Sequence, residues 1–127
     1  MRFRQTTSSL LLAALLLGAA ARAEERVQIL VQSSPLAGSQ YYALTAVWKE
    51  IRPGDKLLLT REPDNRHDGN AIRVEWNGQQ LGYVPRAENR ALAEAMDRGE
   101  RVEARVAHIR KHRNPWQRVE FEVYLLL

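Results

Sequence analysis

Cations and one aromatic ring gather near the C-terminus, in the segment His108–Arg118 with the sequence HIRKHRNPWQR. Arginine and lysine contact phosphates, and an aromatic face stacks on a base, which contributes about 1–3 kcal/mol per base in single-strand binding. We therefore predict an anion-contacting role for Arg110, Lys111, Arg113 and Trp116. The alternative is a solvated hairpin tip with the indole packed onto the body of the domain.

Two adjacent tyrosines, Tyr41 and Tyr42, offer further flat rings. They begin the stretch 41–51, whose aromatic and β-branched residues predict a strand. Neighbours on a strand face opposite sides of the sheet, so one ring is expected in the core. The other could serve as a ligand platform.

The segment 61–70, with the sequence REPDNRHDGN, is dense in turn-forming residues. It predicts a tight polar loop between two strands. Within it, Asp68 is expected to accept hydrogen bonds from nearby backbone amides, which is a structural role.

The same loop partly matches an EF-hand calcium loop. Asp64, Asp68, Gly69 and Glu75 fall at its positions 1, 5, 6 and 12. However, Arg66 places a cation where position 3 needs a ligand, and the flanking segments predict strands rather than helices. We expect no calcium here.

Other metal and catalytic patterns are weak. The chain has no cysteine, which excludes thiolate zinc sites and a catalytic thiol. His67, His108 and His112 could form a three-histidine zinc site only if the fold joined them. Ser33 and Ser34 lack a nucleophile-elbow context. We expect no cofactor, no metal and no enzyme, with a metal-dependent hydrolase that uses the His67–Asp68 loop as the minor alternative.

Residues 1–23 have the three parts of a secretory signal peptide. Arg2 and Arg4 form the positive start, and the apolar run Leu10–Ala21 is shorter than the ~20 residues of a membrane helix. The pattern Ala-Arg-Ala then predicts cleavage after Ala23. The expected location is periplasmic or secreted, with no stable membrane insertion after cleavage. An uncleaved N-terminal anchor is the alternative.

This segment also accounts for most of the net charge. The 127 residues contain 19 Lys and Arg against 15 Asp and Glu, a formal charge of +4. Three arginines and no acid precede residue 24, so residues 24–127 carry a net charge of only +1. Positive charge is then concentrated in 101–118.

The elements that must position these residues are mostly short strands. Hydrophobic alternation and turn signals predict one helix, which begins near Pro85 and ends at Gly99, and a type I′ turn at Asn77-Gly78. The expected strands are 27–31, 41–51, 56–60, 71–76, 80–84, 102–106 and 119–125, of which 56–60 is expected to be buried. This pattern predicts a mainly β domain with one helix, a small closed or partly open β-barrel.

The loop and the glycine pattern resemble the HIRAN domain family. The resemblance rests on Gly38–Tyr42, on the stretch Arg61–Val74 that contains REPDNRHDGNAIRV, on Gly78, and on LGYVP at 81–85. It covers about residues 36–126. It implies a small barrel related to the OB fold that binds nucleic acid and, in DNA-repair proteins, captures single-stranded DNA with a free 3′ end.

The resemblance also implies roles for the rings. The base-stacking aromatics correspond to Tyr41, with Tyr42 beside it, and the position that is usually aromatic before the motif aspartate is His67 here. Gln40 stands where an arginine is common, which removes a phosphate-binding cation.

The polar residues of the motif receive roles in the same way. Asp68 would accept a hydrogen bond from the terminal 3′-hydroxyl, and Asn70 would orient the loop. Tyr83 and Arg86 would line the path of the nucleic-acid backbone.

The domain division that follows is a signal peptide at 1–23, a lead-in strand at 24–35 and a HIRAN domain at 36–127. The expected function is an exported nucleic-acid-binding module, with single-stranded DNA 3′ ends as the expected ligand. The alternative is an envelope module that keeps the barrel for a protein, peptide or glycan partner, which Gln40 and the near-neutral charge favour.

Overall fold

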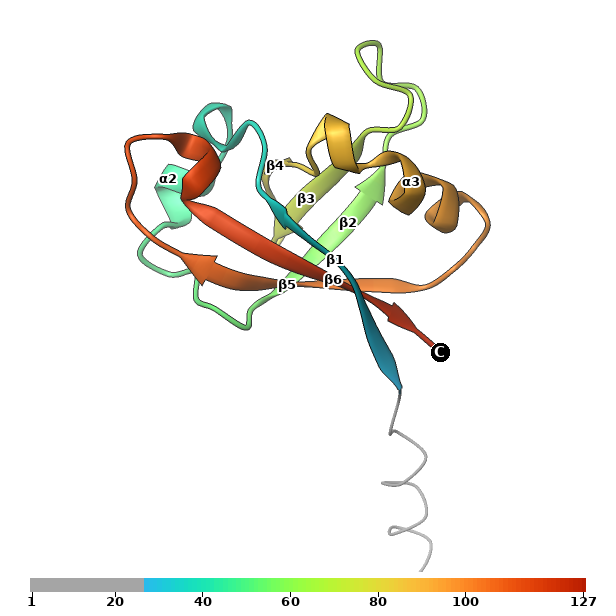
Figure 1. Cartoon of the computed structure of the whole chain (residues 1–127). Helices are drawn as coiled ribbons and strands as arrows, with labels where there is room; N and C mark the ends of the chain where they lie inside the picture. The colour runs from blue at the N-terminus through green and yellow to red at the C-terminus, as the bar shows by residue number, and fades with distance from the viewer. Residues whose placement is uncertain (1–26) are drawn as a thin grey trace, which may run out of the picture.

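The computed structural model describes residues 27–127 (Figure 1). The predicted signal peptide and its cleavage site lie outside the described residues. The six strands are β1 (Gln28–Pro35), β2 (Lys56–Arg61), β3 (Ile72–Trp76), β4 (Gln79–Tyr83), β5 (Val102–Ile109) and β6 (Val119–Leu126). The helical segments are α2 (Leu44–Val47), α3 (Arg90–Asp97) and the 3₁₀ turns η1 (Ser39–Tyr41), η2 (Arg86–Glu88) and η3 (Pro115–Gln117).

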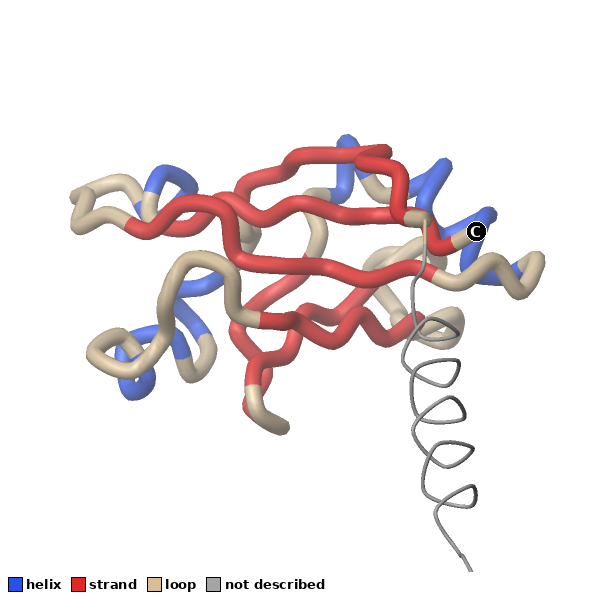
Figure 2. The backbone as a smooth tube through the Cα atoms, turned by 90° about the horizontal axis from the view of Figure 1, so that it is seen from below, coloured by secondary structure: helices blue, strands red, loops and turns tan. Residues whose placement is uncertain are grey.

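The strands form one antiparallel sheet in the order β1-β6-β5-β2-β3-β4. Figure 2 shows the sheet bending around a common interior, with the helical segments toward its periphery. The predicted β3–β4 turn is confirmed, because Asn77 and Gly78 both have positive φ angles, 45° and 79°, as a type I′ turn requires. The fold is thus the predicted mainly β, OB-like barrel in its partly open form.

The two edges of the sheet meet at a single bridge. Ala37, just after β1, exchanges two backbone hydrogen bonds of 2.9 Å with Tyr83 at the end of β4. A Cβ atom at Gly82 would lie 2.3 Å from the Ala37 carbonyl oxygen, so only glycine permits this approach. The bridge brings the start of η1 against β4 and sets the position of Tyr42 relative to Tyr83.

The interior is filled by residues of β2 to β6, of α2 and α3, and by Leu36, which directly follows β1. Alternating residues of β3, β5 and β6 face inward, as their sequence periodicity predicts. The core comprises Leu36, Leu44, Val47, Ile51, Leu57, Ile72, Val74, Trp76, Leu81, Val84, Leu92, Ala93, Ala104, Val106, Val119, Phe121 and Val123.

The predicted strand at 41–51 is wrong. The chain instead makes the 3₁₀ turn η1 and the short helix α2. The reason is visible in the burial pattern, since Leu44, Val47 and Ile51 are all buried and recur at helical rather than strand spacing. Gly38, at φ 72°, starts the turn that leads out of β1. Tyr41 and Tyr42 are therefore not on opposite faces of a sheet.

Three smaller expectations also change. β1 continues through Pro35, so the segment Ser33–Pro35 pairs with β6 instead of ending the strand. Pro85 precedes η2, and the α-helix itself begins at Arg90. β2 was expected to be buried, but Leu58 is 61% exposed.

Candidate nucleic-acid interface

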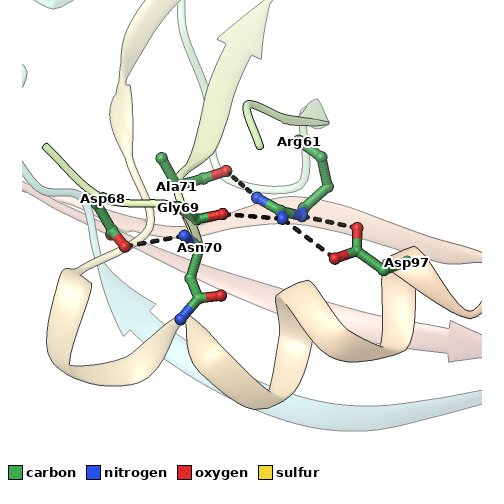
Figure 3. Close-up of polar contacts among 6 residues, drawn as sticks. All are labelled: Arg61, Asp68, Gly69, Asn70, Ala71 and Asp97. Carbon is green, nitrogen blue, oxygen red and sulfur yellow. Dashed lines mark hydrogen bonds and ion pairs between the residues drawn. The ribbon is translucent and has the colours of Figure 1, made fainter. Parts of the chain in front are cut away.

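The side chain of Arg61 fixes the loop between β2 and β3 from inside. Its guanidinium donates to the carbonyl oxygens of Gly69 and Ala71, at 3.0 and 2.7 Å, and to both carboxylate oxygens of Asp97, at 3.1 and 2.9 Å (Figure 3). These bonds join both ends of the loop to the last turn of α3. The hydrogen bond from Arg61, partly offset by burial, lowers the pKa of the Asp97 carboxyl.

A second set of bonds shapes the first half of the loop. The Asn65 side-chain oxygen accepts from the backbone N–H groups of His67 and Asp68, at 2.8 and 3.2 Å, as expected of an asparagine in a turn. The Asn65 amide donates to Glu62 Oε1 at 3.0 Å, and the Tyr83 hydroxyl donates to the same oxygen at 2.9 Å. The loop is thereby tied to β4.

Asp68 is held at both carboxylate oxygens. Oδ1 accepts from the Asn70 backbone N–H at 2.9 Å, and Oδ2 accepts from the side chain of the buried Asn89 at 2.7 Å. The predicted capping role of Asp68 is confirmed. Burial raises the pKa of Asp68, but the hydrogen bonds from Asn70 and Asn89 and the charge of Arg86 outweigh it, so the net pKa is lowered. Asp68 is an ionised acceptor at neutral pH.

A groove of about 260 Å³ opens between this loop, η1 and the end of β4. The rings of Tyr42 and Tyr83 meet edge to face, with centroids 5.9 Å apart and planes at 67°. Five of the predicted site residues line this groove: Tyr42, His67, Asp68, Tyr83 and Arg86. Burial raises the pKa of Tyr83, and the hydrogen bond and negative charge of Glu62 raise it further, so the phenol stays protonated at neutral pH.

Two predicted residues contribute differently. Tyr41 is 78% exposed and does not line the groove, whereas Tyr42, the second choice for stacking, is 39% exposed and does line it. Asn70 contacts Asp68 through its backbone N–H, and its side chain lies outside the groove lining.

The basic segment forms the loop between β5 and β6. Arg110 donates to the Gln117 carbonyl oxygen at 3.1 Å, and Arg118 donates to the His112 carbonyl oxygen at 2.8 Å. The side chain of Asn114 caps η3 by accepting from the Trp116 N–H at 3.1 Å. The Trp116 side chain is half exposed rather than packed into the core.

This loop lies beside the tyrosines, because η3 packs against η1 (Figure 1). The fold therefore places the basic segment and the groove next to each other along one side of the barrel. A second hollow of about 600 Å³ lies against β1 and contains Arg110 and Trp116 in its wall, together with Glu120. Arg113 lines neither of these hollows, and neither does Lys111.

The cations of the basic segment differ from several other arginines in whether they form an ion pair with a carboxylate. Among the described residues, the four Lys and Arg side chains of 110–118 form no ion pair with a carboxylate, unlike five arginines elsewhere. Those five are Arg61, Arg73, Arg90, Arg98 and Arg105. The cations of the basic segment are thus electrostatically available to an anionic ligand.

Sequence reasoning missed the residues that hold the loop, namely Arg61, Glu62, Asn65 and Asn89. Their partners lie far away in sequence, as with Arg61 and Asp97. Only Asn65 carried a local signal, since an asparagine two residues before a turn amide favours this bond.

The described residues contain no group of three or more His, Asp or Glu side chains placed to hold a metal ion. In particular, His67 lies in the groove, while His108 and His112 lie in the walls of two other hollows. Among the helices between Val27 and Leu127, none is long and apolar enough to cross a membrane.

Fold and site together define a small OB-like barrel domain that presents an aromatic and polar groove beside a basic loop. The HIRAN domain family model matches residues 29–127, and the chain belongs to this family. The matched residues include most of β1. Family membership supports a nucleic-acid-binding module as the class of protein.

Solved structures are similar to this chain. A crystal structure of a protein from Lactobacillus plantarum, a structural genomics target, shares 28% identity at a TM-score of 0.69 and covers 80% of this chain and 98% of its own. The HIRAN domain of human HLTF shares 24% identity at a TM-score of 0.55, with 78% and 77% covered, which shows a common fold. No curated protein matches the chain.

Proposed function

We propose that this protein is an exported, non-enzymatic module that binds single-stranded DNA with the free 3′ end in the Tyr42–Asp68 groove. The observation that carries the proposal is the fixed, ionised carboxylate of Asp68 in a groove walled by two tyrosines. Such a groove offers a hydroxyl acceptor next to aromatic faces.

Asp68 has the capacity for a third hydrogen bond. Each carboxylate oxygen can accept about two, and the Asn70 and Asn89 bonds use one on each. A terminal 3′-hydroxyl would donate to a remaining lone pair, whereas a 3′-phosphate would bring a second negative charge against the carboxylate. Arg86 at the groove wall would contact the preceding phosphate.

Affinity would come from the rings and the neighbouring cations. Stacking on an aromatic face contributes about 1–3 kcal/mol per base and does not depend on the base. The available cations Arg110, Lys111 and Arg113, with Trp116, would contact the strand beyond its end. Binding would therefore be specific for the end and tolerant of sequence.

Export is the second part of the proposal. Residues 1–23 would direct the chain to the periplasm or the medium, with cleavage after Ala23, and the mature protein would not stay inserted in the membrane. The test is to fractionate expressing cells and determine the N-terminus by mass spectrometry. A chain that starts at Glu24 in the exported fraction supports the proposal, and an intact N-terminus in the cytoplasm would overturn it.

The decisive binding test compares oligonucleotides that end in a 3′-hydroxyl or a 3′-phosphate, titrated against residues 24–127. We expect the hydroxyl end to bind at least tenfold more tightly, a preference of about 1.4 kcal/mol. Asp68→Asn should abolish most of that preference. Asp64→Asn is the matched control, because Asp64 is an exposed residue of the same loop. Equal binding of both ends by the natural protein would overturn end capture.

One observation favours a different ligand. Residues 24–127 have a net charge of only +1, and Gln40 lacks the cation common at its position. If no oligonucleotide binds, the groove would instead serve a protein, peptide or glycan partner in the cell envelope.

A further inference from the structure

A cleft of about 420 Å³ lies between α2 and the β5–β6 loop, and it shares no wall residue with the Tyr42–Asp68 groove. We call it the α2 cleft. Its volume is in the range of small-molecule sites, which is about 300–1,000 Å³. It is lined by Leu44, Thr45, Trp48, Lys49, Lys111, His112 and Arg118.

Among the described residues, the lining combines an apolar floor with cations and contains no acidic residue. Leu44 is buried and Trp48 is partly buried against the core. Lys49 and Lys111 are exposed, and within the part of the chain that the structure describes neither forms an ion pair. In contrast, the 600 Å³ hollow against β1 has Glu120 in its wall. An anion would therefore favour the α2 cleft.

The loop side of the cleft is held in place by backbone bonds. Arg118 donates to the carbonyl oxygens of His112 and Arg113, at 2.8 and 3.4 Å. His112 Nδ1 accepts from the Asn114 N–H at 2.9 Å, which leaves Nε2 as the donor of the neutral ring. Each of these residues keeps a positive charge or an N–H donor, so the wall offers donors only.

We propose that the α2 cleft binds one nucleotide, with the base against Trp48 and the phosphate between Lys49 and Lys111. A nucleotide joins an aromatic ring to an anion. The described lining residues match both parts, because they supply an indole, two ammonium groups and no carboxylate. A free phosphate would make no use of the apolar floor that Leu44 and Trp48 form.

This inference rests on the proposed function, because it assigns the cleft to a nucleotide of the same strand that lies beyond the 3′-terminal nucleotides held in the groove. Tyr42 lines the groove and Leu44 lines the cleft. Two residues of extended chain span at most about 7 Å, so the two sites lie on either side of a short backbone segment. A strand that leaves the groove past η1 would reach the cleft directly.

The test uses thymidine oligomers of two, four and six nucleotides with 3′-hydroxyl ends. We expect the longer oligomers to bind more tightly. Lys49→Ala with Lys111→Ala should weaken the hexamer about tenfold and reduce the log–log salt slope by about 0.7, since the cleft holds one phosphate and each single-strand phosphate contact contributes about 0.7. Binding of the dimer, which fits the groove alone, should not change. Lys56→Ala, an exposed lysine at the start of β2, is the matched control.

The failure of each proposal gives a different result. If the oligomers bind with a 3′-hydroxyl preference but the double variant binds the hexamer normally, the cleft assignment is wrong and end capture stands. If no oligomer binds, end capture is wrong. In that case a titration with deoxyadenosine 5′-monophosphate tests the α2 cleft separately. The NMR signals of the indole N–H groups report whether the nucleotide binds there. A shift lost on Lys49→Ala supports a nucleotide site there, and no shift overturns it.

Discussion

Two polar loops of this barrel differ in the partners to which their charged side chains bond. In the loop at 61–71, Arg61, Glu62 and Asp68 all bond to other parts of the fold. In the loop at 110–118, the side-chain hydrogen bonds that the cations form within the described residues all go to the same loop: to backbone carbonyl oxygens and to the side-chain oxygen of Gln117. The first loop therefore has Arg61, Glu62 and Asp68 fixed in place by the fold, whereas the cations of the second loop have no acidic partner among the described residues and remain available to a ligand.

We therefore expect the first loop to determine which strand end is bound, and the second loop to determine how tightly the strand is bound. A carboxylate held by two donors presents one geometry to a ligand and discriminates between chemical ends. Cations without acidic partners attract any phosphate and lose strength in salt. The contact between η1 and η3 places the second loop beside the groove that the first loop lines. The predictions below separate the two contributions, from the largest expected effect to the smallest.

Replacing Arg61 should damage the fold most. Arg61→Met keeps the length of the side chain but removes the side-chain donor to the Gly69 carbonyl oxygen, one of the two donors to the Ala71 carbonyl oxygen, and the ion pair with Asp97. The Arg61 side chain is only 12% exposed. Loss of these charge-assisted hydrogen bonds, of which the one to Ala71 is partly buried, predicts a fall of about 1.5–3 kcal/mol in the free energy of unfolding, measured in urea. Arg110→Met, at an exposed site in the basic loop, should change it by less than about 0.5 kcal/mol. Equal effects would remove the contrast between the loops.

Asn65 should have the next largest effect. Asn65→Ala removes the acceptor for the His67 and Asp68 amides and the donor to Glu62, and predicts a loss of about 1–2 kcal/mol. Hydrogen exchange of the two amides should accelerate. The corresponding change in the basic loop, Asn114→Ala, removes one cap of a 3₁₀ turn and should cost about 0.5–1 kcal/mol. Unchanged exchange at His67 would show that the loop does not depend on Asn65.

Much of this fold was predictable from sequence because it follows local patterns. The alternation at 71–76 and 119–125 and the Asn77-Gly78 turn each depend on adjacent residues, and the structure confirms them. The interval 41–51 was not predictable in this way. Its composition favours a strand. In the structure, however, Leu44, Val47 and Ile51 are buried in the core, and their spacing is helical.

The candidate site shows the same division. Asp68 could be assigned a capping role from its own loop, and the family motif indicated His67 and Tyr83. Arg61, however, acts through Asp97, which is 36 residues away, and no local pattern reports such a partner. The exchange of roles between Tyr41 and Tyr42 follows from the same mistake, since η1 rather than a strand decides which ring faces the groove.

The pH dependence of stability should also differ between the loops. The pKa of Asp68 is lower in the folded protein than its ordinary value of 3.8, so the unfolded chain binds more protons in that range. The stability that Asp68 contributes is then present above about pH 4 and is lost as the pH falls through the lowered folded pKa. The melting temperatures of the natural protein and of Asp68→Asn should therefore differ most above pH 4 and converge in stronger acid. Asp64→Asn serves as the control, and a gap that stays constant down to pH 2 would contradict this assignment.

The smallest effect on stability, and the clearest effect on binding, should come from Arg113. It is exposed and contributes only its carbonyl oxygen to a bond within the described residues, so Arg113→Ala should leave the free energy of unfolding unchanged within about 0.5 kcal/mol. If the arginine contacts one phosphate, the log–log salt slope for a single strand should become shallower by about 0.7, with the 3′-hydroxyl preference intact. Asp68→Asn should do the reverse, with the slope kept and the end preference lost. Should Arg113→Ala alter the end preference instead, the two loops would form one recognition site, because a cation that only attracts phosphates cannot distinguish a hydroxyl end.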